Sequence, residues 1–149
     1  MNAPFSLQQG NILLLADPGN FNAAYIRRSL EMVGVSVVVP DGTPDEALAS
    51  IDPTEWLNFT ACIAVDIGKA MLDTLSAQQQ KIPFVFVGAD PGDWFAGPYS
   101  WLCPPFAGFQ VIELLGDMVA AASRTMQAGL DFAAFAGMNS SGQAEQSDA

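Results

Sequence analysis

The sequence predicts an α/β domain built on a doubly wound, mostly parallel five-stranded sheet. Short unbroken apolar runs alternate along the chain with segments of helical periodicity. Strands that are buried on both faces of a parallel sheet give runs of this kind, and right-handed crossovers leave few other topologies. With 149 residues, of which 50% are hydrophobic and 14% charged, the chain suits one globular domain.

The first two strand–helix units have clear boundaries. The run NILLLAD (11–17) predicts the first strand, and the helix after it has apolar residues spaced three and four apart. These residues are Ala23, Ile26, Leu30 and Val33. Asn20 or Asn22 can cap this helix and Gly34 can end it. The β-branched run VSVVVPD (35–41) predicts the second strand.

A capping signal follows the second strand. Thr43 is placed as the N-cap of the second helix, with Pro44 at its first position and Glu46 closing a capping box. The third strand is TACIAVD (60–66), and the helix after it covers about 69–80. Its inner face is formed by Met71, Leu72 and Leu75.

The second half of the chain is less regular. IPFVFVG (82–88) predicts the fourth strand, but ADPGDWFAGP (89–98) is so rich in Gly, Pro and Asp that the fourth helix is expected to be short or missing. YSWLC (99–103) predicts the fifth strand. The last helix follows, with a spaced set of apolar residues. They are Val111, Leu115, Met118, Ala122 and Met126.

These elements predict a main domain over 11–124, after a lead-in of residues 1–10. A helical extension is expected over 125–137, followed by a small, polar, disordered tail over 138–149. The apolar stripe from residue 118 to 135 has two interpretations: a core helix with a frayed end, or a dimerisation or docking helix.

Composition narrows the functional classes. Five basic residues against sixteen acidic ones give a formal charge of −11, which argues against binding to nucleic acid or anionic lipid. No apolar run is long enough to span a membrane and the first ten residues do not form a signal peptide, so a cytoplasmic site is expected. The chain has no histidine, and Cys62 and Cys103 lack metal-binding spacing. We therefore expect no enzyme and no cofactor, apart from a weak case for Mg²⁺.

Acidic residues follow three of the predicted strands: Asp17, Asp66 and Asp90. In a doubly wound sheet, ligands bind beyond the carboxyl ends of the strands. Asp17 and Asp66 are expected to be neighbours there, and two carboxylates with open water suit Mg²⁺. The alternative is that each acid simply caps the helix that follows it.

The segments ILLLADPGNFNAAYIRRSLEMVG, CIAVDIG, IPFVFVGAD and SWLCPPF resemble, in order, the landmarks of CheY-like receiver domains of two-component response regulators. The resemblance covers about 11–124 and implies a flavodoxin-like sheet of order 2-1-3-4-5. It also implies that Asp66 is the phosphoacceptor and Asp17 a Mg²⁺ ligand.

The sequence departs from that family at three site positions. Ala16 stands where the family has an acid, Gly88 where it has Thr or Ser, and Pro104 where it has Lys. Phosphoryl transfer depends on positioned cations and donors, so little phosphorylation is expected. Lys69 is a weaker candidate for the missing cation. The family resemblance also places a cis peptide bond at Pro104–Pro105.

The region after the fourth strand is similar, more weakly, to the N-terminal receiver of FleQ-type regulators. Aromatic side chains gather there, and they either cover the core or form a protein-binding surface. They are Trp94, Phe95, Tyr99, Trp101 and Phe106.

The leading hypothesis is a degenerate receiver (pseudo-receiver) that acts in bacterial signal transduction as a phosphorylation-independent protein–protein interaction module. Its partner would be another signalling protein, such as a kinase or regulator, or a second copy in a homodimer. One alternative is a phosphorylatable receiver with Asp66 as acceptor. The other is a flavodoxin-like small-molecule-binding domain that uses the loops DPGN and GADPGDW.

Overall fold

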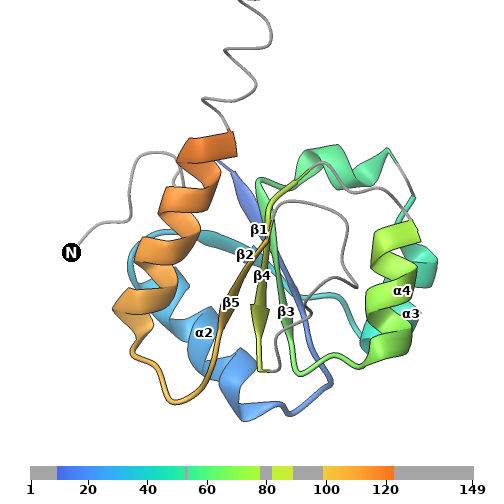
Figure 1. Ribbon diagram of the computed structural model, residues 1–149, viewed down its shortest axis with the longest axis horizontal. Helices are drawn as coiled ribbons and strands as arrows, with labels where there is room; N and C mark the ends of the chain where they lie inside the picture. Colours follow the sequence, from blue (N-terminus) through green and yellow to red (C-terminus); the bar gives the residue numbers. More distant parts are fainter. Residues whose placement is uncertain (1–9, 53, 78–81, 89–98, 123–149) are drawn as a thin grey trace, which may run out of the picture. The chain divides into compact units, whose positions relative to one another are not determined.

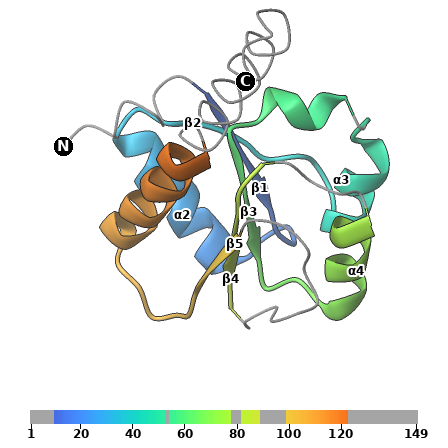
Figure 2. The same ribbon diagram turned by 45° about the horizontal axis from the view of Figure 1, so that its top comes forward.

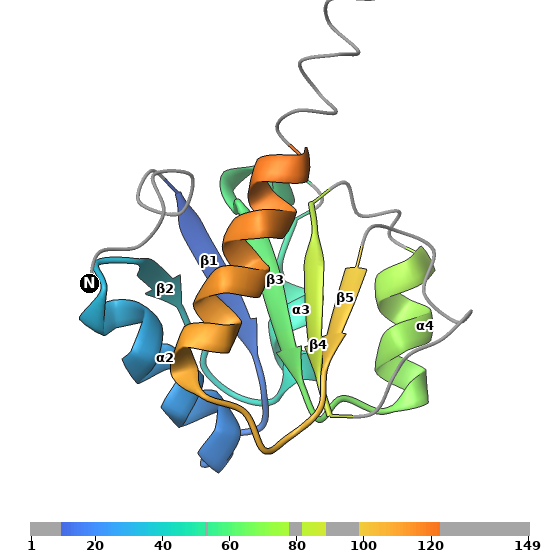
Figure 3. The same ribbon diagram turned by 60° about the vertical axis from the view of Figure 1, so that its left-hand side comes forward.

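The structure is a computed structural model of the chain, and it describes residues 10–52, 54–77, 82–88 and 99–122. Five parallel strands form one sheet in the order β2-β1-β3-β4-β5, as Figure 3 shows. The strands are β1 (Asn11–Leu15), β2 (Ser36–Val38), β3 (Ala61–Val65), β4 (Phe84–Val87) and β5 (Tyr99–Leu102). The predicted fold class is confirmed: the chain has a flavodoxin-like α/β sheet.

Helices cover both faces of this sheet (Figures 1 and 2). Helix α2 (Phe21–Met32) and the last helix, which begins at residue 108, lie on one face. Helices α3 (Pro44–Ser50) and α4 (Lys69–Ala77) lie on the other, together with the short 3₁₀ helix η1 (Glu55–Asn58). The compact unit that contains the sheet ends at Val119. The predicted boundaries after residues 124 and 137 lie outside the described residues.

The core has two layers because successive side chains of a strand point to opposite faces. In β1, Ile12 and Leu14 pack under α2 and the last helix, whereas Leu13 and Leu15 pack under α3 and α4. All five residues of β3 are buried. Each aliphatic side chain buried in this way contributes about 1.5–3 kcal/mol, so this central strand anchors both layers.

One buried side chain of β3 is ionisable. The Cys62 side chain lies in the α3/α4 layer and is fully buried. Because burial disfavours the thiolate, it raises the pKa of the Cys62 thiol well above its ordinary value. Cys103, by contrast, is exposed.

Local signals set the helix boundaries as the sequence predicts. The Asn20 side chain caps α2 by accepting a hydrogen bond from the backbone N–H of Ala23 at 2.9 Å, and Gly34 follows its end with φ of +88°. Thr43 and Glu46 form the predicted capping box. Hydrogen bonding to the Thr43 backbone and hydroxyl lowers the pKa of Glu46.

Strand β2 is shorter than the predicted run 35–41. The backbone N–H of Val35 donates to Leu30 O at 3.1 Å, so this residue still belongs to the end of α2. Pro40, at the other end of the run, has no N–H to continue a ladder. The strand is therefore limited to Ser36–Val38, which pairs with Asn11, Ile12 and Leu13 of β1.

The other differences are small. Helix η1 was not predicted, and its Trp56 is buried with its ring 6.0 Å from that of Phe84.

The Pro104–Pro105 peptide bond is cis, as the family resemblance implies. The segment expected to lack a fourth helix (89–98), the end of the predicted 69–80 helix and the helical extension past residue 122 lie outside the described residues. Among the described helices, none combines the length and apolar character required to cross a bilayer.

Candidate functional site

The carboxyl ends of β1 and β3 bring Asp17 and Asp66 to one small cleft. Both side chains are exposed and line a pocket of ≈ 210 Å³ beside the first turn of α3, which contributes Asp45. This is the place where a doubly wound sheet offers a crevice. Within the described residues, no three His, Cys, Asp or Glu side chains come close enough to hold a metal ion. Mg²⁺ binding by Asp17 and Asp66 therefore stays a prediction that rests on two carboxylates.

Asp66 is held in an unusual backbone conformation at the end of β3. Its φ is +52°, in the left-handed region that non-glycine residues seldom adopt. Its backbone N–H donates to Val87 O at 2.8 Å, which ties the turn to β4. The carboxylate accepts a hydrogen bond at Oδ2 from Asn20 Nδ2 at 2.9 Å. The acid is therefore restrained at its backbone and at its side chain.

Asn20 has two roles, of which sequence reasoning identified one. Its Oδ1 caps α2, and its Nδ2 donates to Asp66. A side-chain amide has both an acceptor and donors, so capping leaves the NH₂ group available for a second partner. That partner is 46 residues away in sequence, which is why local patterns do not reveal it.

Gly88 approaches Asp66 so closely that little room is left for a side chain at position 88. Its φ is +119°, and a Cβ built at this position would lie 2.7 Å from Asp66 Oδ1. The resemblance to receivers places a hydroxyl side chain at this position. In this protein the positive φ of residue 88 strains any side chain there, and a side chain would also require the Asp66 carboxylate to shift.

Trp101 extends the same site to β5. Its indole Nε1 donates to the backbone carbonyl of Gly88, and the residue remains 44% exposed. Asp66, Gly88 and Trp101 thus form a contiguous row across the ends of β3, β4 and β5. We call these three residues the Asp66 row.

The other predicted aromatic contacts are more deeply packed. Tyr99 is half-buried, with its ring 5.7 Å from that of Phe86. Phe106 is half-buried against the α2 layer, with its ring 5.9 Å from that of Tyr25. Trp94 and Phe95, like Asp90, lie outside the described residues.

Two of the positions that depart from the receiver pattern, Ala16 and Pro104, follow β1 and β5. Ala16 is half-buried and packs against the core. Pro104 follows β5 beside the exposed Cys103. Lys69 is the first residue of α4 and is exposed, but it is not among the residues that line the ≈ 210 Å³ pocket.

Sequence reasoning missed a second set of exposed aromatic residues. Phe21 is 81% exposed and Phe109 54%. Tyr25, on the same side of α2 as Phe21, accepts a hydrogen bond at Oη from the Gly108 backbone N–H at 2.8 Å. The available signal was the spacing of Phe21 and Tyr25, which places both on the face of α2 opposite its buried residues.

Comparison with known proteins does not assign a family. No protein-family model matches the chain, and no curated protein matches it in sequence.

Proposed function

We propose that the chain is a degenerate receiver-like domain that acts in the cytoplasm, in bacterial signal transduction, as a phosphorylation-independent protein–protein interaction module. The observation that carries the proposal is the lack of room for a side chain at Gly88, where a Cβ would lie 2.7 Å from Asp66 Oδ1, in a sheet of order 2-1-3-4-5. The strand-end acid of a receiver is present. The space for the hydroxyl side chain that would assist it is closed.

Charge supports the phosphorylation-independent part. A phosphoryl group brought to Asp66 needs cations and donors to stabilise its developing charge. Ala16, Gly88 and Pro104 supply neither metal ligand, hydroxyl nor ammonium group at the positions that the resemblance assigns to them. One of the two amide N–H bonds of Asn20 is already donated to Asp66 Oδ2.

Trp101 is the anchor that we assign to the partner surface. A half-exposed tryptophan held by a hydrogen bond has little rotamer freedom left to lose on binding, and tryptophan is enriched at binding hot spots. The formal charge of −11 favours a signalling protein with a basic face over a second copy of the chain. A homodimer would require the apolar contacts to outweigh this repulsion.

A second candidate function is a phosphorylatable receiver with Asp66 as acceptor. It is favoured by the shared pocket, in which Asp17 and Asp66 are joined by Asp45 from α3. In this candidate, Asp17 and Asp66 bind Mg²⁺ and Lys69 provides the missing positive charge. It predicts Mg²⁺-dependent binding of phosphoryl mimics.

Tryptophan fluorescence separates the two candidates. Wild type, Asp66→Asn and Trp101→Phe are titrated with Mg²⁺ and then with beryllofluoride, a phosphoryl mimic. The proposed function predicts no saturable change in the folded wild type at millimolar Mg²⁺. A saturable change that is lost in Asp66→Asn and reduced in Trp101→Phe would instead establish Asp66 as a working acceptor.

Photocrosslinking in cells of the source organism tests the interaction itself. A photoreactive amino acid is placed at position 101 and, as a control, at Leu57 in η1, which is 72% exposed and lies at the opposite end of β3 from Asp66. The proposal predicts a discrete adduct from position 101, absent from position 57 and unchanged in an Asp66→Asn background. Equal adducts from both positions, or loss of the adduct in Asp66→Asn, would contradict it.

A further inference from the structure

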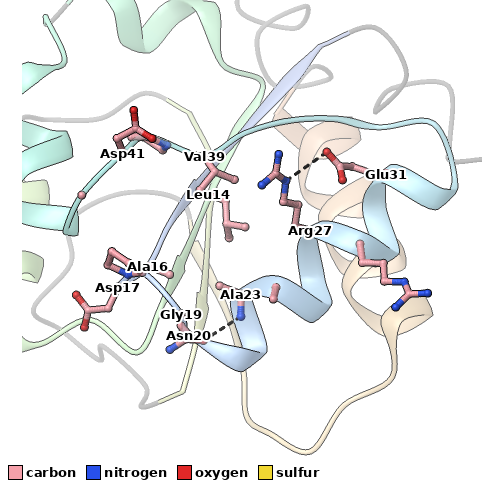
Figure 4. Close-up of a pocket in the computed structure, with 15 residues that line it drawn as sticks. Leu14, Ala16, Asp17, Gly19, Asn20, Ala23, Arg27, Glu31, Val39 and Asp41 are labelled. Carbon is pink, nitrogen blue, oxygen red and sulfur yellow. Dashed lines mark hydrogen bonds and ion pairs between the residues drawn. The ribbon is translucent and has the colours of Figure 1, made fainter.

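A larger pocket lies at the other side of the sheet's carboxyl edge. It has a volume of ≈ 570 Å³ and is enclosed by the end of β1, the outer side of α2 and the loop 39–42 (Figure 4). It exists because β2 stops pairing at Val38 while β1 continues to Leu15. The chain then turns away through Val39 and Pro40, and the space beside the last residues of β1 stays open.

The floor of this pocket is apolar. Leu14 of β1 lies at its centre, between Val39 and Ala23 (Figure 4). Leu14 and Ala23 are buried and Ala16 is half-buried, so they give the floor a rigid backing. Pockets of about 300–1,000 Å³ with mostly apolar walls and a few polar groups are typical of small-molecule sites.

Two arginines from α2 line the same pocket. Arg27 extends from the helix toward the Val39 loop (Figure 4). Its pair with Glu31, at 3.3 Å, is half-exposed on both sides, and such surface pairs contribute about 0–1 kcal/mol. A ligand can therefore compete for this guanidinium. Within the described residues Arg28 forms no ion pair, so its guanidinium group is available to a ligand without the loss of one.

Three acids also line the pocket, and one of them, Glu31, is the residue that pairs with Arg27. Asp17 and Asp41 are both exposed lining residues, and their carboxylates point away from Leu14 in Figure 4. The chain has five basic residues in all, and two of them are at this one pocket. The lining has two basic residues against three acidic ones, whereas the whole chain has five against sixteen, so the excess of negative charge is much smaller at this pocket.

We propose that this pocket binds a small organic anion, with a compact apolar body on Leu14 and Ala23 and one carboxylate or phosphate group on Arg27 and Arg28. Guanidinium groups match both anions through paired hydrogen bonds. The volume admits a body of one or two rings. This proposal does not depend on the proposed interaction function, because none of its residues belongs to the Asp66 row.

Nuclear magnetic resonance of ¹⁵N-labelled full-length protein tests the site, with 1-naphthoate as probe. Saturable shifts are expected at the backbone amides of Gly19, Ala24 and Gly42, which line the pocket. The neutral analogue 1-naphthalenemethanol should bind several-fold more weakly, and 1-naphthyl phosphate distinguishes a preference for phosphate from one for carboxylate. No saturable shift at millimolar probe, or equal binding of the neutral analogue, would overturn the proposal.

Three variants assign the binding to the pocket. Arg27→Gln and Arg28→Gln should each weaken naphthoate binding by about tenfold, as expected for the loss of one charge-assisted hydrogen bond. Lys69→Gln removes the same charge on α4, away from the pocket, and should change binding less than twofold. Ala24→Leu adds bulk at an exposed helical position that lines the pocket and should block binding without unfolding the chain. Unchanged affinity in both arginine variants would refute the assignment.

Discussion

The two sides of one sheet edge differ in how they are filled. Across the ends of β3, β4 and β5, the Asp66 carboxylate faces Gly88 and the Trp101 indole is hydrogen-bonded to the Gly88 carbonyl. At the ends of β1 and β2, a pocket of ≈ 570 Å³ remains open above Leu14. Both regions use the same kind of strand and the same edge. The early end of β2 leaves one side open, and the close approach of Gly88 to Asp66 closes the other.

This difference separates the chemistry that each side can support. The closed side presents a restrained acid and a half-exposed indole, which suit contact with another protein. The open side presents an apolar floor and two arginines, which suit a small anion. The following experiments test whether the two sides differ as described, beginning with the largest expected effect.

Core truncations should be unequal on the two sides. On the closed side, Phe86→Ala removes a buried ring near the carboxyl end of β4 that contacts Phe84 and Tyr99, and we expect it to lower the free energy of unfolding by about 3–5 kcal/mol. Leu14 borders the open pocket, so we expect Leu14→Ala to lower the free energy of unfolding by about 2 kcal/mol, the low end for such a change. Urea denaturation measures both. A larger loss for Leu14→Ala would show that the open side is packed as tightly as the closed one.

Three glycine variants compare the two sides at the backbone. Gly88→Ala combines a φ of +119° with a contact to Asp66, and the backbone conformation alone should cost about 1–3 kcal/mol. Gly19→Ala on the open side has a φ of +83° but no atom within 4 Å of the new Cβ, so a cost of about 1–2 kcal/mol is expected. Gly68→Ala meets no atom within 4 Å and has no positive φ. It is the control, with little change in thermal unfolding expected.

If Gly88→Ala proved no more destabilising than Gly68→Ala, Asp66 would have to move freely away from Gly88. The closed side would then be open to a hydroxyl side chain, and the main support for a phosphorylation-independent function would be lost.

Alkaline pH tests how well the α3/α4 layer of the core, which contains Cys62, excludes water. Because the buried Cys62 thiol has a raised pKa, its contribution to stability is complete below the unfolded-state pKa of about 8.5. Above that pH, stability should fall by up to about 1.4 kcal/mol per pH unit until the folded pKa is reached. The measurement is urea denaturation of wild type and Cys62→Ala between neutral pH and pH ~10, a range chosen to bracket the thiol pKa.

Cys62→Ala lacks this titration, so the stability gap between the two proteins should narrow as pH rises. A constant gap would mean that Cys62 does not change its protonation behaviour on folding. Thiol labelling at neutral pH provides an independent check, with Cys103 reacting in the native protein and Cys62 reacting after unfolding.

The two helix caps give the smallest expected effects. Asn20→Ala and Thr43→Ala should each cost about 1 kcal/mol through loss of a capping acceptor. Asn20→Ser keeps the acceptor but loses the amide that reaches Asp66, so it isolates the link between α2 and β3. It should recover most of the stability lost in Asn20→Ala. Equal thermal shifts for Asn20→Ser and Asn20→Ala would show that the link to Asp66, not the cap, stabilises this turn.

The sequence predicted features that depend on neighbouring residues. The apolar runs of β1, β3 and β4, the Asn20 cap and the Thr43–Glu46 capping box all result from patterns a few residues long. It overestimated β2, because the hydrogen bond from Val35 to Leu30 is made by the preceding helix and is invisible in a β-branched run. Strand propensity alone does not show which backbone donor is already used.

The candidate site was predicted in part. Asp17 and Asp66 do line one cleft, since both follow neighbouring parallel strands. The contacts of Asp66 with Asn20 and Gly88 join residues from three different strand ends, and no local pattern encodes such contacts. The two adjacent arginines at the open pocket, Arg27 and Arg28, were missed for the same reason, since their role depends on where β2 ends.

The shortness of β2 also affects how the protein behaves at high concentration. Among the described strands, β2 is the first in the sheet order and has one side without a strand partner. A long β-branched edge strand would be a template for pairing with another chain. Three paired residues followed by Pro40 leave little for a second molecule to extend. The interruption that opens a pocket within one molecule therefore also protects the sheet against growth from one molecule to the next.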